Sequence, residues 1–573
     1  MTVFKHDVLI LGSGIAGLRT ALETSSSNVA VLTKVYPHRS HSASAQGGIS
    51  AALGNEEEDK WEWHMFDTVK GSDYLADQDA VEVFAKEAPN ALYELEHMGV
   101  PFSRNADGKI AQRSFGGHTK NFGEKPVKRA CYASDRTGRV ILDTLYEQCV
   151  KHNVRFYPEL LATSLLMNDN VCVGLVAYEI ANGQLHTFQS KATILATGGC
   201  GRIFRTTSNA YATTGDGLAL AYRAGIPLED MEFVQFHPTG IYKLGILISE
   251  AARGEGAILT NGKGERFMEQ YAPVLKDLAP RDVVSRAILT EIRNGRGVDN
   301  SDYVNLDLTA LGRERIEERL PDLASFAKTY VGIDVAKEPI PVAPTCHYLM
   351  GGIPTDSEGQ VLGEKGTVKG LFAVGECACI SIHGANRLGT DSLLDLVVFG
   401  RRTGKAVMDY LKNTEHEPLP ENQIENTRKQ IEAFFQSNGN ESSYLIRKEM
   451  RQMMLDKCSV FREEKNLEDA LKTIRKLKGR YKNIALKNRG RVFNQEIIET
   501  LELGFMLDLS ETIVASAMAR KESRGAHYRE DFPNRDDKNF LKHTLIKASA
   551  SGDPVISYKS VVVTRFQPKT RQY

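Results

Sequence analysis

Short apolar runs and glycine-rich turns alternate at the start of the chain. Residues 8–11 are an apolar run of strand length, residues 12–17 form a glycine-rich turn, and residues 18–24 open a helical pattern. A second apolar run follows at residues 29–32. This order of strand, turn, helix and strand predicts a βαβ unit, and therefore a parallel sheet.

Two later apolar runs have the same character. Residues 193–196 and 371–374 are both of strand length, and a glycine follows each closely. We expect them to join the first two strands, so that one sheet is assembled from both ends of the first 410 residues. The segment between them, residues 233–352, is then an inserted domain.

The pattern changes after residue 412. Residues 413–421 are polar and carry two prolines, which predicts a linker. Beyond it, apolar positions recur at spacings of three, four and seven, typical of one face of a helix, at Leu467, Leu471, Ile474 and Tyr481. Near the end, residues 552–554 (Gly-Asp-Pro) introduce two strand-like runs, 555–558 and 561–566.

One basic stretch lies within the helical region. Residues 472–491 contain nine basic side chains and no acidic one. The simpler interpretation is a solvated helix face, and the alternative is a docking surface for an acidic partner.

Length, composition and net charge favour a multidomain soluble protein over a nucleic-acid-binding or membrane-spanning one. A chain of 573 residues is too long for one core, so we expect two to four domains. The apolar share of 42% and the charged share of 25% are typical of soluble proteins. A formal net charge of -1 gives no overall attraction to nucleic acid. No apolar run approaches the roughly 18 residues needed to cross a membrane, and the early strand leaves no room for a leader peptide.

The eight cysteines are scattered, and no Cys-x-x-Cys pair occurs. Zinc and iron–sulfur sites need clustered thiolates, so we interpret these cysteines as buried, reduced thiols and expect no metal site. If electrons leave this chain through iron–sulfur clusters, those clusters must lie on a partner chain.

The glycine-rich turn matches the dinucleotide pattern GxGxxG and lies between a predicted strand and helix. Its residues are Gly12, Ser13, Gly14, Ala16 and Gly17, with one further residue at 15. In this context the helix N-terminus faces the phosphates of a dinucleotide. An NAD site usually has an acidic residue about 20 positions further on, but the second predicted strand ends in Thr33-Lys34. From the residues alone, two interpretations of the glycine-rich turn stay open: it binds FAD, or it is a degenerate dinucleotide site.

The following stretch, residues 34–49 (KVYPHRSHSASAQGGI), carries a resemblance to a known family. It is similar to the flavin-attachment segment of the succinate dehydrogenase and fumarate reductase flavoproteins. The resemblance extends over nearly the whole chain through ordered motifs, at residues 214–217 (TGDG), 235–240 (QFHPTG), 253–256 (RGEG), 280–282 (PRD), 344–348 (PTCHY), 383–389 (HGANRLG) and 522–527 (ESRGAH).

The resemblance and the pattern together predict the architecture. We expect an α/β FAD-binding Rossmann-like domain, formed by residues 1–232 and 353–412. An inserted α+β capping domain, residues 233–352, carries much of the substrate site. A helical domain, 413–535, and a small C-terminal β region, 536–573, follow.

In this family the last histidine of the HRSH stretch holds FAD covalently, and that position is His41. A metal site is the alternative for an HxxH pair, but it needs a helix and further ligands. The related L-aspartate oxidases lack this histidine. The resemblance also implies that FAD is contacted by Gly12, Ser13, Gly14, Ala16, Gly17, Thr33, Lys34, Ser40, Gln46, Gly47, Gly48, Asp216, Glu376, Ser392 and Leu393; the alternative for Glu376 is a helix cap.

Succinate and fumarate are small dianions, which need cationic or donor groups at both ends. The resemblance assigns substrate binding to His237, Ser249, His347 and Arg387. It assigns proton transfer to Arg281, with Glu250 and Arg253 as a relay. Because a guanidinium almost never loses its proton in proteins, Arg281 acting only to stabilise developing charge is the alternative.

One departure from the family pattern lies beside the expected substrate site. Residues Thr390-Asp391 stand where small or amide side chains are common. A carboxylate near a dianion is unfavourable unless it is paired or points away.

The resemblance implies a subunit of a larger complex. The expected partners are an iron–sulfur subunit, membrane anchor or cytochrome b subunits reached through it, and indirectly quinone. The chain would lie as a peripheral subunit on the cytoplasmic face of the inner (plasma) membrane. Gln46 favours succinate oxidation, whereas residues 561–571 look as much like fumarate reductases. A soluble L-aspartate oxidase-like enzyme and an FAD-dependent tRNA-modifying scaffold are the rivals, and we expect no nucleic-acid partner.

Overall fold

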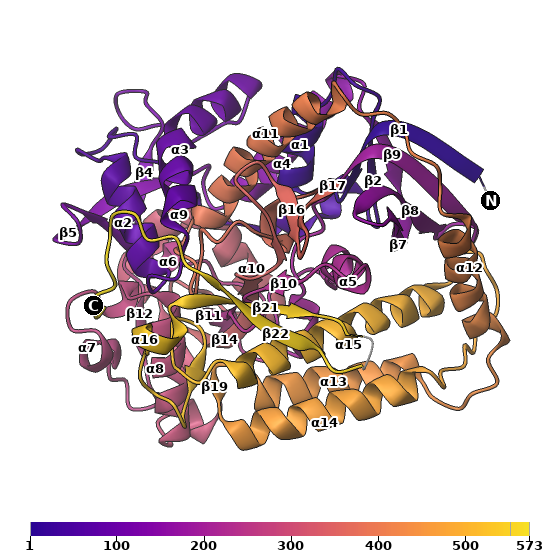
Figure 1. Ribbon diagram of the computed structural model, residues 1–573. Helices are drawn as coiled ribbons and strands as arrows, with labels where there is room; N and C mark the ends of the chain where they lie inside the picture. The colour runs from indigo at the N-terminus through magenta and orange to yellow at the C-terminus, as the bar shows by residue number, and fades with distance from the viewer. Residues whose placement is uncertain (1, 550–551, 572–573) are drawn as a thin grey trace.

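The computed structural model describes residues 2–549 and 552–571 (Figure 1). The predicted regions 1–232 and 536–573 therefore include positions 1, 550–551, 572 and 573 that lie outside the described residues. Among the described helices, none is long and apolar enough to cross a membrane.

An eight-stranded sheet forms the centre of the predicted FAD-binding region. The four predicted strands lie next to one another in the order β17-β9-β1-β2, all parallel, with Leu371 opposite Thr193 and Val8 opposite Val29. The sheet comprises β1 (Thr2–Leu11), β2 (Val29–Thr33), β6 (Arg155–Pro158), β7 (Leu160–Asn168), β8 (Val171–Glu179), β9 (Leu185–Leu195), β16 (Gln360–Gly363) and β17 (Gly366–Ala373). The sequence thus predicted correctly that distant segments build one sheet.

The sheet is mixed rather than wholly parallel. β8 pairs antiparallel with both β7 and β9, and β16 pairs antiparallel with β17. Apolar runs predict burial but not strand direction, and these strands are joined by short turns that only antiparallel neighbours allow. The prediction of a parallel sheet was therefore right for the nucleotide-binding core and wrong for the added strands.

Helices pack on this sheet and carry much of the site. The first helix, α1, packs against α11 and α4, and a three-stranded sheet of β3, β4 and β5 lies beyond α2. These elements are α1 (Ile15–Glu23), α2 (Trp61–Gly71), α3 (Gln78–Met98), α4 (Thr137–Lys151), α5 (Asp216–Arg223), α11 (Asp391–Leu411), β3 (Ile49–Ser50), β4 (Gln112–Lys120) and β5 (Lys125–Cys131).

The inserted segment has its own sheet and its own buried core. Four antiparallel strands run in the order β11-β14-β13-β12, and a separate apolar cluster packs around them. We keep 233–352 as the proposed bounds of this capping segment. Its elements are β11 (Val234–Ile241), β12 (Ile258–Thr260), β13 (Val304–Asp307), β14 (Ile340–Leu349), α6 (Ala251–Glu255), α7 (Met268–Tyr271), α8 (Arg281–Arg293), α9 (Arg313–Arg319) and α10 (Pro321–Val331).

Four long helices follow the predicted linker. Residues 414–420 contain neither helix nor strand, and the helices are α12 (Glu421–Gln436), α13 (Ser443–Lys457), α14 (Glu464–Tyr481) and α15 (Gln495–Ala519). In Figure 1, α13, α14 and α15 lie side by side along the lower edge. On the predicted face of α14, Leu467 and Ile474 are fully buried, and Leu471 and Tyr481 pack against the same core.

The basic stretch 472–491 is partly neutralised within the chain. Arg475 and Lys478 bind Glu511, and Arg480 binds Glu441. These ion pairs favour the interpretation as a solvated helix face.

A small sheet forms at the end of the chain, but one predicted strand is absent from it. β21 (Lys542–Lys547) pairs with β22 (Val555–Ser560) and with β10 (Leu228–Glu229). Residues 561–566, predicted as a strand, form none, because the backbone N–H groups of 564, 565 and 566 donate to the Gln78 side chain instead. The remaining short elements are β15 (Ile353–Pro354), β18 (Ala378–Cys379), β19 (Phe461–Arg462), β20 (Tyr528–Arg529) and α16 (Asp537–Phe540).

Candidate functional site

One continuous cavity joins the glycine-rich turn to the capping segment. Its empty volume is about 1540 Å³, including space open to solvent. Of the predicted site residues, all but Gly17 and Arg253 line it. The cavity therefore brings together side chains from residue 12 to residue 393.

Different steric contacts require glycine at positions 12 and 17 of the turn. Gly12 has φ +114°, and a Cβ there would lie 2.2 Å from the Ala196 carbonyl oxygen. A Cβ at Gly17 would lie 2.1 Å from the carbonyl oxygen of Gly12, so Gly17 serves helix–turn packing rather than the cavity wall. Gly14 caps the N-terminus of α1 without a capping side chain. The first N–H groups of α1 therefore face a cavity in which phosphate oxygens can accept their hydrogen bonds.

Lys34 and Asp216 bind each other at one end of the cavity. The Lys34 Nζ atom lies 2.8 Å from Asp216 and 2.8 Å from Glu502 of α15. Burial alone would lower the pKa of Lys34, but the two carboxylates raise it above its usual value. Thr33 accepts a hydrogen bond of 2.9 Å from Ser13. Glu502 escaped sequence reasoning because only the packed fold brings α15 to this point.

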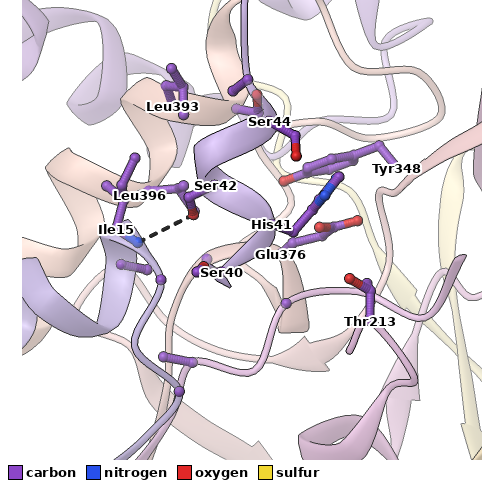
Figure 2. Close-up of a pocket in the computed structure, with 18 of the residues that line it drawn as sticks. Ile15, Ser40, His41, Ser42, Ser44, Thr213, Tyr348, Glu376, Leu393 and Leu396 are labelled. Atoms are coloured by element: carbon purple, nitrogen blue, oxygen red, sulfur yellow. Dashed lines mark hydrogen bonds between the residues drawn. The ribbon is translucent and has the colours of Figure 1, made fainter. Parts of the chain in front are cut away.

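His41 points into the cavity from a short 3₁₀ turn, His41–Ser44. Figure 2 shows its ring close to the side chains of Tyr348 and Glu376, while Ser42 accepts a hydrogen bond of 3.3 Å from the Ile15 N–H. The Ala210 N–H donates to His41 Nδ1 at 3.3 Å, and Asn209 Nδ2 lies 3.4 Å from Nε2. Burial lowers the pKa of His41 to about 4, so the ring is neutral and nucleophilic at pH 7.

The other histidine of the HxxH pair lies elsewhere. His38 is exposed, and its Nδ1 lies 3.0 Å from Asp143. The two side chains therefore have separate surroundings.

Arg113 and Phe115 fix the loop that follows His41. Arg113 donates to the carbonyl oxygens of Gln46 and Gly47, at 3.1 and 2.7 Å. A Cβ at Gly47 would lie 2.7 Å from the Phe115 ring, and Gly48 has φ +127°. The Gln46 Oε1 atom is buried and has no protein partner among the described residues. This backbone arrangement leaves Gln46 able to accept a hydrogen bond from a bound group.

Glu376, Ser392 and Leu393 close the opposite wall. Glu376 accepts a hydrogen bond of 3.1 Å from the Leu349 N–H. Burial raises the pKa of Glu376 to about 7. Its position in the cavity wall favours a contact with a bound cofactor over the alternative of a helix cap. These residues, the turn at 12–16 and the 40–48 loop fit an elongated dinucleotide such as FAD.

Donor groups from two regions surround the far end of the cavity. The rings of His237 and His347 lie 5.1 Å apart, and Arg387 stacks on Tyr348 with 4.4 Å between the guanidinium carbon and the ring centre. Burial, reinforced by nearby arginines, holds the pKa of both histidines well below the usual range. Burial and Arg281 lower the pKa of Arg387 to about 10, so it stays charged at neutral pH.

Several of these donors lack a protein partner. The Thr239 N–H donates to His237 Nδ1 at 3.2 Å, which leaves the proton of the neutral ring on Nε2. Among the described residues, His237 Nε2 and Arg387 Nε are buried without partners. Ser249 is buried, and its hydroxyl oxygen accepts from the Ala251 N–H at 3.2 Å, so its hydrogen is free to donate. Unpaired buried donors are costly unless a ligand accepts their hydrogen bonds, and two carboxylates provide such acceptors.

Arg281, Glu250 and Arg253 form a buried chain of charges. Arg281 Nε donates to Glu250 at 2.8 Å, and Arg253 Nη2 lies 3.5 Å from the same oxygen. Burial alone would raise the pKa of Glu250, but the two arginines lower it. As expected from their spacing, Glu250 and Arg253 are neighbours at the start of α6. Arg253 does not line the cavity and stands behind Glu250.

Asp391 does not line the predicted dianion site and is paired. Its carboxylate accepts hydrogen bonds from Ser50 at 2.5 Å and Thr68 at 2.9 Å, and His64 lies at 3.2 Å. Although burial opposes it, these contacts lower the pKa of Asp391 to about 2. The departure from the family pattern therefore places no free carboxylate in the substrate site.

Sequence reasoning missed several side chains that position the site. Gln235 Oε1 accepts from Arg281 at 3.0 Å and from Arg387 at 3.4 Å, so it bridges the two arginines. Ser208 lies 2.8 Å from His347 Nδ1. Gln235 is the first residue of the motif at 235–240 and could have been found there, whereas Ser208 and Asn209 carry no local signal.

Comparison with known proteins agrees with this site. Residues 7–393 match the family model described as FAD binding domain, and residues 447–573 match Fumarate reductase flavoprotein C-term. The succinate dehydrogenase flavoprotein subunit of Rickettsia conorii is 50% identical over 98% of this chain and 96% of its own length. The subunit of the same name from Coxiella burnetii is 50% identical over 95% of this chain and 94% of its own length.

A solved structure shows the same fold. A quinol fumarate reductase chain of E. coli superposes with a TM-score of 0.94 at 39% identity, over 100% of this chain and 99% of the other. The matches span the FAD-binding region, the capping segment and the helical region together. The chain therefore belongs to the family of succinate dehydrogenase and fumarate reductase flavoprotein subunits.

Proposed function

We propose that this chain is the catalytic flavoprotein subunit of a succinate dehydrogenase. It holds FAD covalently through His41, oxidises succinate to fumarate, and passes the electrons to an iron–sulfur partner subunit. Through that partner it reaches membrane anchor subunits and quinone, and it lies as a peripheral subunit on the cytoplasmic face of the inner (plasma) membrane.

One observation carries this proposal. A single cavity contains both the dinucleotide turn with His41 and the buried donors His237, His347 and Arg387. A dinucleotide seated along the turn therefore ends beside a site whose unpaired groups suit a dianion. No separate channel is needed between cofactor and substrate.

FAD, when bound, supplies an acceptor for the hydride that leaves succinate. The turn at Gly12–Gly14, the Gln46–Gly48 loop, Glu376 and Asp216 are the groups that would hold it. His41 supplies a neutral ring nitrogen for the covalent bond, because its pKa lies at about 4.

The chain's own residues orient the substrate. His237 Nε2, the Ser249 hydroxyl and the Arg387 guanidinium donate to the carboxylates, and His347 lies opposite. Because these side chains are buried, water is excluded and each charged hydrogen bond is strengthened. Such an arrangement would let one methylene carbon of succinate face the bound cofactor and the next face Arg281.

In succinate oxidation, Arg281 passes a guanidinium proton to the Glu250 carboxylate and, transiently neutral, accepts the proton from that second carbon. Among the described hydrogen bonds its Nε serves Glu250 and its Nη1 serves Gln235, which leaves Nη2 for the substrate. Succinate loses a hydride from one carbon and a proton from the other. Glu250 stabilises Arg281 while the proton moves, and Arg253 continues the path. In fumarate reduction the same groups deliver the proton in reverse.

Steady-state rates test the proposal. The purified, FAD-loaded chain should reduce an artificial electron acceptor with succinate, and should not do so with L-aspartate. Aspartate-dependent reduction without a succinate reaction would favour the oxidase alternative. Fumarate reduction by a reduced dye measures the opposite direction, and a faster reverse rate would favour a fumarate reductase, the activity named for the E. coli relative.

A further inference from the structure

Residues 561–571, called the strap below, run along the FAD-binding region after β22. The Val562 N–H donates to Asp77 at 2.7 Å. Gln78, which is fully buried, accepts three backbone N–H bonds from 564–566 and donates to the Phe566 carbonyl at 2.7 Å. One buried amide therefore fixes the path of several strap residues at once.

Further contacts hold the strap on the same side. The Phe566 ring lies 5.3 Å from Phe66 and 6.2 Å from Phe122, measured between ring centres. Arg535 donates to the Lys569 carbonyl at 2.9 Å. Figure 1 shows the yellow chain end passing α2 and reaching the elements of the capping segment. The strap is thus firmly attached to the FAD-binding region before it reaches the neighbouring segment.

Arg571 connects the two regions through a single guanidinium group. Its Nη2 atom lies 3.0 Å from Asp73, between α2 and α3, and 2.8 Å from Asp282 in the first turn of α8. All three side chains are at least nine-tenths buried. Burial alone would raise the pKa of Asp282, but Arg571 and Arg286 lower it to about 2, so the carboxylate stays charged.

The position of this junction matters because Asp282 follows Arg281. The helix that begins at Arg281 carries the proton-transfer group, whereas Arg387 belongs to the FAD-binding region. The distance between α8 and that region therefore sets the size of the substrate site. Other contacts of α8 lead elsewhere: Arg281 pairs with Glu250 inside the capping segment, and Arg293 pairs with Glu530 at 2.7 Å. Arg286 donates to the Gly525 carbonyl at 2.8 Å.

We propose that Arg571 is a positioning residue that latches α8 to the FAD-binding region and keeps the capping segment closed over the dicarboxylate site. The inference rests on the proposed function for the identity of the substrate. Without the latch, Asp73 and Asp282 lose their shared cation, and more of the protein occupies an open state. Substrate binding must then drive closure, which reduces apparent affinity but not the rate once the site is filled.

Arg571→Ala tests the latch by the split between KM and kcat. We expect KM for succinate to rise about tenfold, with kcat within about twofold, because only the closed fraction falls. In Arg571→Lys, KM for succinate should lie between the value of Arg571→Ala and that of the native chain. Arg565→Ala is the matched control, since Arg565 belongs to the strap but pairs with Glu82 of α3; its KM should not change.

Hydrogen exchange gives a second readout that needs no reaction. In Arg571→Ala, amides of residues 281–293 should exchange faster, while those of α14 should not. A native KM together with native exchange in α8 would overturn the proposal. If the native chain reacts with neither succinate nor fumarate, the proposed function fails, but faster exchange in α8 alone would still support the latch.

Discussion

Arg281 donates from Nε to Glu250 at 2.8 Å, and both side chains are buried. The contact joins α8 to the start of α6 inside the capping segment and aims the guanidinium at the cavity that also holds His41. Gly116 of β4 donates to the other oxygen of Glu250 at 2.9 Å. The carboxylate is therefore fixed from both regions of the chain, and so is the arginine that it holds.

Replacing Arg281 with lysine tests its role in proton transfer. Lysine keeps a positive charge but cannot hold Glu250, Gln235 and the substrate together with a planar fork. We expect FAD content and malonate binding to stay near native values, while kcat falls by about 10²–10⁴-fold, the usual contribution of a general acid or base. Turnover close to the native rate in Arg281→Lys would remove this residue from the mechanism.

His41→Ser tests the covalent bond and its purpose. Alkylation through an electron-poor imidazole raises the reduction potential of the flavin, which helps it to accept electrons from succinate, a weak reductant. We expect the variant to bind FAD without a covalent bond, to reduce fumarate, and to oxidise succinate poorly. His38→Ser is the control, because His38 is exposed and pairs with Asp143. Flavin fluorescence on a denaturing gel reports whether FAD is covalently bound, and rates of succinate oxidation and fumarate reduction report the effect of that bond. Undiminished succinate oxidation in His41→Ser would refute the proposed purpose of the bond.

Asp391→Ala tests the buried contacts that the Asp391 carboxylate makes beside Arg387-Leu388-Gly389. Removing the carboxylate leaves the hydroxyls of Ser50 and Thr68 and the His64 ring without their acceptor. We expect the free energy of unfolding to fall by about 3 kcal/mol, because several buried polar groups lose their hydrogen-bond acceptor at once. Asp409→Ala, on the same helix but exposed and paired among the described residues with Lys412, should cost less than about 0.5 kcal/mol. Equal losses in urea denaturation would contradict the assignment.

His543 makes stability depend on pH at alkaline values. Burial alone would lower its pKa, but Asp230 and Glu229, together with Asp77, raise it to about 10, and Lys559 lies beside the same carboxylates. Because the folded pKa exceeds the usual value of 6.5, this stabilisation is complete below pH 6.5 and is lost as pH rises towards 10.

The change in the free energy of unfolding with pH that is due to His543 can be measured by comparing the native chain with His543→Gln. Between pH 7 and 10 the free energy of unfolding should fall by at most about 1.4 kcal/mol per pH unit through this one proton. His543→Gln should remove that part of the slope, whereas His152→Gln, an exposed change, should not. Identical pH profiles for native protein and His543→Gln would show that His543 is not charged in the fold.

The fold was predictable where the pattern is local. The strand, glycine turn, helix and second strand expected within residues 8–32 followed from apolar runs and from steric demands that Gly12 and Gly17 meet in the structure. The first strand begins earlier than expected, at Thr2. Strand direction was not predictable, because β7 and β8 are buried whether they pair parallel or antiparallel. The strap was also missed, since its hydrogen bonds depend on Gln78, nearly 490 residues away.

In the site too, residues with a local sequence signal were predictable and residues brought in by distant packing were not. Motifs identified the side chains that line the cavity, including His41, His237 and Arg387. They did not identify Asn209, which contacts His41 across 168 positions of sequence, or Glu502, which reaches Lys34 from α15. Such partners carry no local signal, because their roles arise only when distant elements pack.

Anaerobic addition of succinate to the FAD-loaded chain tests the central claim most directly. We expect succinate to bleach the visible absorption of the flavin and fumarate then to restore it, with neither change in a variant in which Arg387 and His347 are both replaced by alanine. A flavin whose absorption is unaffected by both dicarboxylates would contradict the account.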